Sequence, residues 1–116
     1  MIVEVRTYTI ATGLRQRFLD LFETRTRPLQ QSLGIQVFGP WLDMENPDRF
    51  VWLRAFPSPA ERDAMKRALY EGPEWIGELG SVMMPMLADF TSIQVEMDGE
   101  ALAALALANN RRQGRS

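Results

Sequence analysis

The chain has 116 residues, 46% of them hydrophobic and 24% charged, with a formal net charge of −2. It is long enough for one folded domain and lacks the basic excess of a general nucleic-acid binder. It contains no Cys and no His, which excludes disulfides, thiolate nucleophiles and the usual metal and haem ligands. We therefore predict no metal site and no cofactor. The N-terminus does not resemble a signal peptide and no apolar run approaches a membrane span, so we expect a cytoplasmic protein.

The first half of the chain predicts a strand, a helix and a hairpin. Alternation over 2–10 predicts the first strand, and apolar residues at threes, fours and sevens over 14–33 predict a helix. Pro28 lies inside that helical pattern and is expected to interrupt it, because proline removes a donor and clashes with the preceding turn. Strands over 35–42 and 49–56 then follow, joined by a tight turn.

The second half predicts another helix and a last strand. Ser58 is placed to cap a helix, with proline at the first helical position and Glu61 completing a capping box. This helix is expected to end near Gly72. A short helical piece over 74–82 then leads to the last strand, at about 87–97.

The order strand, helix, strand, strand, helix, strand predicts an α+β fold, the ferredoxin-like split β-α-β sandwich. Its antiparallel sheet would have the order 4-1-3-2. We expect this domain to span 1–98, followed by a short C-terminal helix over 99–108 and a disordered tail over 109–116.

Each predicted strand alternates between two kinds of side chain, which project from opposite faces of the sheet. The apolar face carries Val3, Val5, Ile35, Val37, Val51, Leu53, Ala55, Ile93, Val95 and Met97. The mixed face carries Glu4, Arg6, Tyr8, Gln36, Phe38, Trp52, Arg54, Phe56, Ser92, Gln94 and Glu96. We expect both helices to cover the apolar face and the mixed face to lie open in the monomer. Burying its aromatic side chains would then favour a homodimer that packs sheet on sheet.

Several short motifs carry a family resemblance. They are Glu4 to Thr9 followed by Gly13, Gly34 to Gly39, Trp41, Leu53 to Phe56 running into Ala60 to Arg62, and Pro73 to Trp75. Together these motifs resemble the NIPSNAP family, and the resemblance covers roughly residues 2–97, nearly all of the predicted domain. The resemblance implies the dimeric α+β-barrel group, in which two ferredoxin-like protomers enclose a cavity.

The resemblance implies architecture more than chemistry, because the family has no firmly established biochemical activity. The wider barrel group includes cofactor-free monooxygenases, haem-degrading enzymes, isomerases and cyclases. Its haem-binding members use a histidine, which this chain lacks.

The mixed face supplies the candidate site residues. Its two arginines would anchor a carboxylate, phenolate or enolate, and the candidates for moving a proton are Glu4, Glu96 and Tyr8. The predicted ligand-binding residues are Arg6, Tyr8, Phe38, Trp52, Arg54 and Phe56. The alternative is that each arginine pairs with a glutamate across the strand, in a network that stabilises the dimer without catalysis.

Two registers of the first and third strands keep the mixed face aligned. One places Arg6 opposite Arg54, which is unfavourable for like charges. We predict the other, with Glu4 opposite Arg54, Arg6 opposite Trp52 in a cation–π contact, and Glu96 beside Arg6.

Two functions remain open at this point. The leading function is that of a homodimer that binds a small aromatic or anionic metabolite. It covers both binding alone and a transformation of that metabolite without a metal. The alternative is a non-enzymatic dimeric interaction module whose inner sheet face is only an interface. A cavity of ~300 Å³ or more, lined by Arg6, Tyr8 and Arg54, would favour the first. Neither nucleic acid nor a membrane is expected as a partner.

Overall fold

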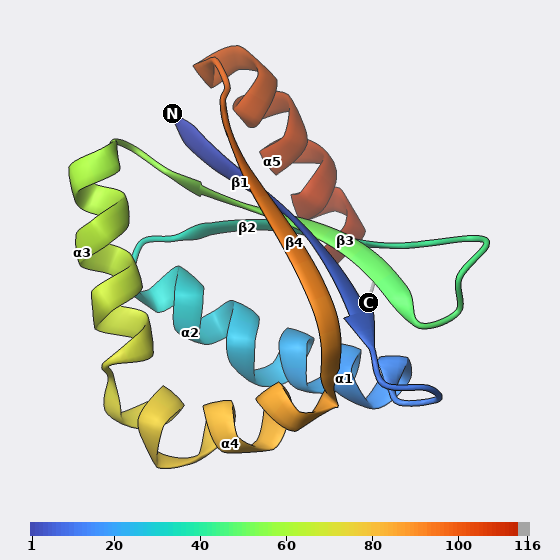
Figure 1. Cartoon of the computed structure of the whole chain (residues 1–116). Coiled ribbons are helices and arrows are strands. Elements are labelled where there is room, and N and C mark those ends of the chain that lie inside the picture. Colours follow the sequence, from blue (N-terminus) through green and yellow to red (C-terminus); the bar gives the residue numbers. More distant parts are fainter. Residues whose placement is uncertain (114–116) are drawn as a thin grey trace.

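Four antiparallel strands form one sheet that carries helices on both faces (Figure 1). The structure is a computed structural model that describes residues 1–113. Its strands are β1 (Ile2–Ile10), β2 (Gln36–Leu42), β3 (Arg49–Phe56) and β4 (Leu87–Glu96). Their order, β2-β3-β1-β4, is the predicted 4-1-3-2 order counted from the other edge. The predicted α+β ferredoxin-like fold is therefore confirmed.

The helical segments of the described residues include α-helices, π-helices and a 3₁₀-helix. They are α1 (Arg15–Leu21), η1 (Phe22–Thr26), α2 (Arg27–Ser32), α3 (Pro59–Tyr70), η2 (Trp75–Leu79), α4 (Gly80–Met83), η3 (Met84–Met86) and α5 (Gly99–Gln113). The expected interruption before Pro28 is present, because η1 is a π-helix and Pro28 falls in the first turn of α2. Ser58 caps α3 as predicted, its Oγ accepting a hydrogen bond of 3.2 Å from the Glu61 backbone N–H. None of the helices in the described part of the chain is long and apolar enough to cross a membrane.

The prediction of which sheet face the helices cover is wrong. Helices α1 to α4 pack on the mixed face, and α5 lies on the other side of the strands (Figure 1). Trp52 and Phe56 are only 2% and 0% exposed within a single protomer. The ring centroids of Trp52 and Phe22 lie 5.0 Å apart. The aromatic side chains of the mixed face bury more apolar area than valine and isoleucine can, so they form the main core.

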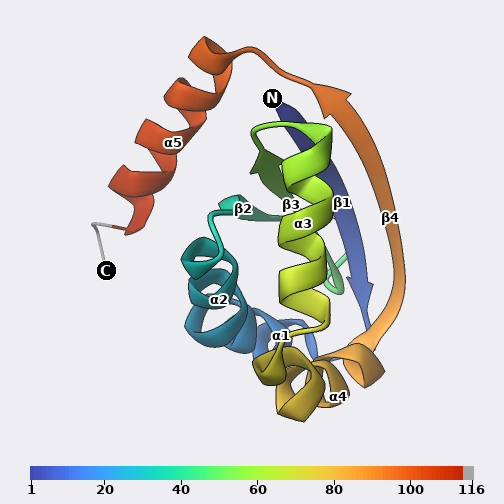
Figure 2. The same cartoon turned by 90° about the vertical axis from the view of Figure 1, so that its left-hand side faces the viewer.

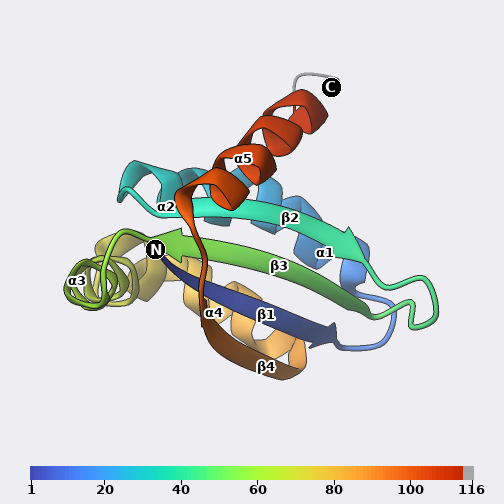
Figure 3. The same ribbon diagram turned by 90° about the horizontal axis from the view of Figure 1, so that it is seen from above.

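The second face holds a smaller core beneath α5. Its buried members are Val3, Phe38, Ala55 and Leu102. Phe38 was expected on the mixed face, but it lies opposite Leu53 in the β2–β3 ladder and therefore on this second face. Figure 3 shows α5 crossing β2 on this side. The helix continues through residue 113, into the stretch predicted as a disordered tail, and residues 114–116 lie outside the described residues.

The packing of α5 gives a first testable prediction. Leu102 is 3% exposed, whereas Leu107 of the same helix is 55% exposed. We expect Leu102→Ala to lower the free energy of unfolding by about 2 to 3 kcal/mol, because it leaves a cavity in the smaller core. The matched Leu107→Ala should change it by less than about 0.5 kcal/mol. Urea unfolding of both variants measures the difference, and equal values would mean that α5 does not pack on the sheet.

Candidate functional site

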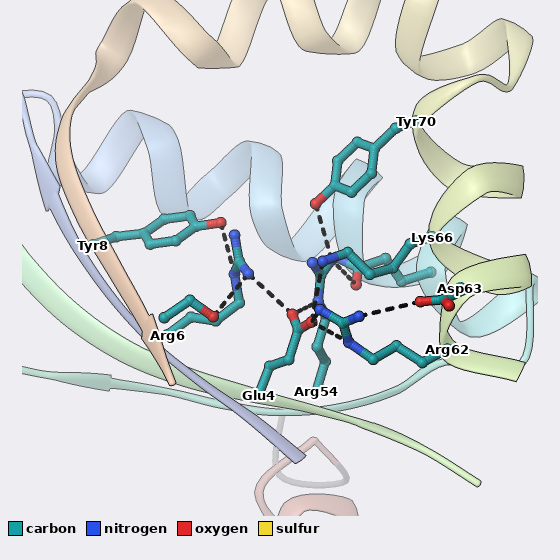
Figure 4. Close-up of polar contacts among 10 residues, drawn as sticks. Glu4, Arg6, Tyr8, Arg54, Arg62, Asp63, Lys66 and Tyr70 are labelled. Carbon is teal, nitrogen blue, oxygen red and sulfur yellow. Dashed lines mark hydrogen bonds and ion pairs between the residues drawn. The ribbon is translucent and has the colours of Figure 1, made fainter. Parts of the chain in front are cut away.

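One buried carboxylate holds four cationic side chains together between the sheet and α3 (Figure 4). Glu4 is 0% exposed. Its Oε1 accepts hydrogen bonds from Arg54 Nε at 2.6 Å and from Arg6 Nη1 at 3.0 Å. Its Oε2 accepts from Arg62 Nε at 2.8 Å and from Lys66 Nζ at 3.1 Å. Arg62 also pairs with the exposed Asp63 at 3.3 Å. Two negative charges thus face four positive charges, and the cluster keeps an excess of positive charge.

The β1–β3 register creates the centre of this cluster. Glu4 lies opposite Arg54, and Arg6 lies opposite Trp52, so the predicted register is confirmed. The guanidinium carbon of Arg6 is 5.7 Å from the centre of the Trp52 ring, within the range of a cation–π contact.

The predicted pairing of Glu96 with Arg6 is wrong. In the β1–β4 ladder Arg6 lies opposite Ser92, and its Nη1 donates to Ser92 Oγ at 3.2 Å. Glu96 lies opposite Ile2 near the end of the strand and is exposed. Its side chain is therefore too far along β4 to share the site of Arg6.

Helix α3 adds three side chains that the sequence analysis did not select. Arg62, Lys66 and Tyr70 recur every four residues and so share one face of the helix. This face points toward Glu4 and Arg54, and Figure 2 shows α3 beside β1. Ala60, Ala64 and Ala68, which also recur every four residues, lie on another face of α3 and are exposed. The sequence signal that could have identified the site is the spacing of Arg62, Lys66 and Tyr70, which begins directly after the capping box.

The cation cluster controls the charge of Glu4. Burial alone would raise the pKa of this carboxyl, but Arg54 and Lys66 outweigh burial and lower the pKa from 4.5 to about 2. Burial likewise works to lower the pKa of Arg54, while Tyr70 and Glu4 raise it. Glu4 is therefore ionised at neutral pH and is a poor proton acceptor. Its geometry makes it the residue that positions the cations.

Two tyrosine hydroxyls each accept a hydrogen bond from one of the buried arginines. Arg6 Nε donates to Tyr8 Oη at 3.2 Å, and Arg54 Nη1 donates to Tyr70 Oη at 3.0 Å. Burial raises the pKa of Tyr8, and the nearby Arg6 lowers it only in part. Tyr8 thus keeps its proton at neutral pH and can act as a hydrogen-bond donor.

A cavity of about 530 Å³ opens beside this cluster. It is lined by Arg6, Tyr8, Arg54, Arg62, Lys66, Tyr70, Trp75, Met84, Leu87, Phe90, Ser92 and Gln94. Its rim includes Met84 and Phe90, which are 49% and 47% exposed. Arg54, by contrast, is 0% exposed, and its Nη2 has no hydrogen-bond partner among the described residues. The cavity therefore combines aromatic walls with a buried, incompletely satisfied cation.

Only part of the predicted ligand-binding set lines this cavity. Arg6, Tyr8 and Arg54 line it. Trp52 and Phe56 instead flank the Arg54 guanidinium, with ring centres 5.5 and 5.8 Å from its central carbon. Phe38 lies on the other face of the sheet and belongs to the core beneath α5.

The comparisons with known proteins agree with this architecture. The NIPSNAP family model matches residues 3–86. A NIPSNAP domain protein from Burkholderia xenovorans has a TM-score of 0.74 and 23% identity over 85% of this chain and 96% of its own. A NIPSNAP family protein from Agrobacterium tumefaciens str. C58 has a TM-score of 0.74 and 18% identity, covering 84% of this chain and 93% of its own.

The fold also extends beyond these two proteins. A putative antibiotic biosynthesis monooxygenase from Nitrosomonas europaea has a TM-score of 0.63 and 15% identity, covering 84% of this chain and 98% of its own. No curated protein gives a significant match. Because the family model matches most of the chain, the protein belongs to the NIPSNAP family.

Proposed function

We propose that this NIPSNAP-family protein binds a small anionic ligand with an aromatic body in the cavity beside α3. The observation that carries the proposal is a cavity of about 530 Å³ whose lining includes four cationic side chains, those of Arg6, Arg54, Arg62 and Lys66. Cationic donors gathered around one cavity favour an anionic ligand, because charge-assisted hydrogen bonds to an anion are stronger than neutral ones.

The charge balance of the cavity supports an anion. Its lining includes four cationic side chains, and Glu4 already accepts hydrogen bonds from all four. The other carboxylate in contact with them within the described residues is that of the exposed Asp63, which pairs with Arg62. The walls also carry the rings of Tyr8, Tyr70, Trp75 and Phe90. Such walls suit a planar body, while the cations suit a carboxylate, phenolate or enolate.

The same groups supply a route to metal-free chemistry. In this proposal the guanidinium groups of Arg6 and Arg54 stabilise a developing oxyanion, and Tyr8 is the candidate to give it a proton. Glu4 positions the cations and does not itself move a proton, since its pKa is about 2.

We also propose a homodimer, but through the sheet face opposite the cavity. The helices of each protomer cover the mixed face, so that face is not available to a partner. On the opposite face Ile93 is 60% exposed, and Val5 and Leu53 are half-buried. A cavity inside the protomer, larger than ~300 Å³ and lined by Arg6, Tyr8 and Arg54, favours ligand binding over a purely structural dimer.

Calorimetric titration with benzoate tests the proposed function. We expect binding that weakens as salt is added, because ion pairing contributes to it. Lys66→Met should weaken binding about tenfold, because it removes one charged donor from the cavity while keeping an apolar stem. Arg67→Met is the matched control, since it removes one exposed positive charge from the same helix outside the cavity lining.

Equal losses in the two variants would show that only overall charge matters, and would contradict binding in this cavity. No binding of benzoate even at millimolar concentration would contradict the proposed function itself.

A further inference from the structure

We infer, on the basis of the proposed function, that the anionic group of the ligand presents two neighbouring oxygens at once, as a carboxylate does. One oxygen would be bound by Arg6 and Tyr8, and the other by Arg54 and Tyr70. Tyr70 then belongs to the binding site, and the site prefers planar anions whose charge is shared by two oxygens.

The two arginine–tyrosine pairs, Arg6–Tyr8 and Arg54–Tyr70, share one hydrogen-bonding arrangement (Figure 4). In each pair the guanidinium donates to the phenolic oxygen, over 3.2 Å in Arg6–Tyr8 and 3.0 Å in Arg54–Tyr70. Each hydroxyl therefore still has its own proton to donate. Within residues 1–108 neither proton is given to a side-chain or backbone acceptor. Each pair thus offers a phenolic donor beside a cation.

Glu4 holds the two pairs close together. Its Oε1 accepts from both Arg6 Nη1 and Arg54 Nε, at 3.0 and 2.6 Å. The two guanidinium groups therefore lie on either side of one oxygen atom. This spacing suits two oxygens on one carbon better than two anionic groups at opposite ends of a ligand.

The side-chain oxygens that contact the two arginines each already accept at least one hydrogen bond. Ser92 Oγ accepts from Arg6 at 3.2 Å, and Gln30 Oε1 accepts from Arg54 at 3.3 Å. Glu4 accepts from four cations. A ligand group with its own N–H would meet donors at this place, so the pairs should discriminate against amides.

Benzoate and benzamide test this discrimination, because the amide replaces one carboxylate oxygen by NH₂. By calorimetry we expect benzoate to bind the unmodified protein at least about 100-fold more tightly. Tyr8→Phe and Tyr70→Phe should each weaken benzoate about tenfold and change benzamide much less, so that the affinity ratio falls. A tyrosine that only supports the fold would weaken both probes equally.

The outcomes separate this inference from the proposed function. If benzoate binds and Lys66→Met weakens it, but neither tyrosine variant changes the ratio, the two-oxygen inference is wrong and the proposed function stands. If benzoate does not bind, both are wrong. Circular dichroism checks that each variant is folded. If Tyr8→Phe fails to fold, the half-buried Tyr70 still decides the result.

Discussion

Glu4→Gln is expected to lower the free energy of unfolding by about 3 to 5 kcal/mol at neutral pH. The substitution keeps the size of the side chain but removes the only carboxylate in contact with Arg6 and Arg54 within the described residues. Both arginines are buried, at 8% and 0% exposure. A buried guanidinium without a counter-charge carries a large desolvation penalty, and a neutral amide offsets little of it. Urea unfolding at neutral pH measures the loss.

Glu96→Gln is the matched control for this variant. It makes the same chemical change in the same sheet, but Glu96 is exposed near the end of β4. Its effect should stay within about 0.5 kcal/mol. Equal and small effects of the two substitutions would show that Glu4 does not hold the cation cluster.

The pH dependence of stability provides a second measurement on the same variant. The pKa of Glu4 is about 2 in the folded protein and 4.5 in the unfolded reference. Lowering the pKa by folding contributes about 3 kcal/mol of stability, fully present above pH 5 and lost as the pH falls toward 2. The unmodified protein should therefore lose stability across this range. Glu4→Gln should lose about 3 kcal/mol less over the same range, because its amide does not titrate.

The strand order and the β1–β3 register could be predicted from local patterns. Alternation identified the strands, and the repulsion expected between Arg6 and Arg54 selected the register that the structure contains. The choice of covered face could not be made in the same way, because both faces carry large apolar side chains. The charges on one face suggested an interface, whereas α3 in fact supplies further charged partners for them within the protomer.

The tertiary contacts of α3 explain why half of the site was missed. Lys66 and Glu4 are distant in sequence, and no local pattern states that their side chains meet. The phase of β2 was ambiguous for a related reason. Val37 and Phe38 are both apolar, so hydrophobicity alone does not decide which of them joins the face of Arg54.

Ile93→Asp is expected to convert the proposed homodimer into monomers. Ile93 is 60% exposed on β4, on the sheet face that α1 to α4 do not cover. Its neighbour across the ladder is Val5, which is half-buried on the same face. A carboxylate buried there against a second copy would have no counter-charge, so dimer affinity should fall about 100-fold or more. Light scattering coupled to gel filtration, over a range of concentrations, measures the change in mass.

Ile76→Asp is the control, because it makes the same substitution at an exposed isoleucine of η2, outside the sheet. Ile76 is 66% exposed, and this variant should keep the mass of the unmodified protein. Both variants should keep the circular dichroism spectrum of the folded protein, since neither isoleucine is buried in the protomer. A monomeric unmodified protein, or a dimer that survives Ile93→Asp, would contradict an interface on this face. The ligand site would be unaffected by either result, because the cavity lining comes from a single protomer.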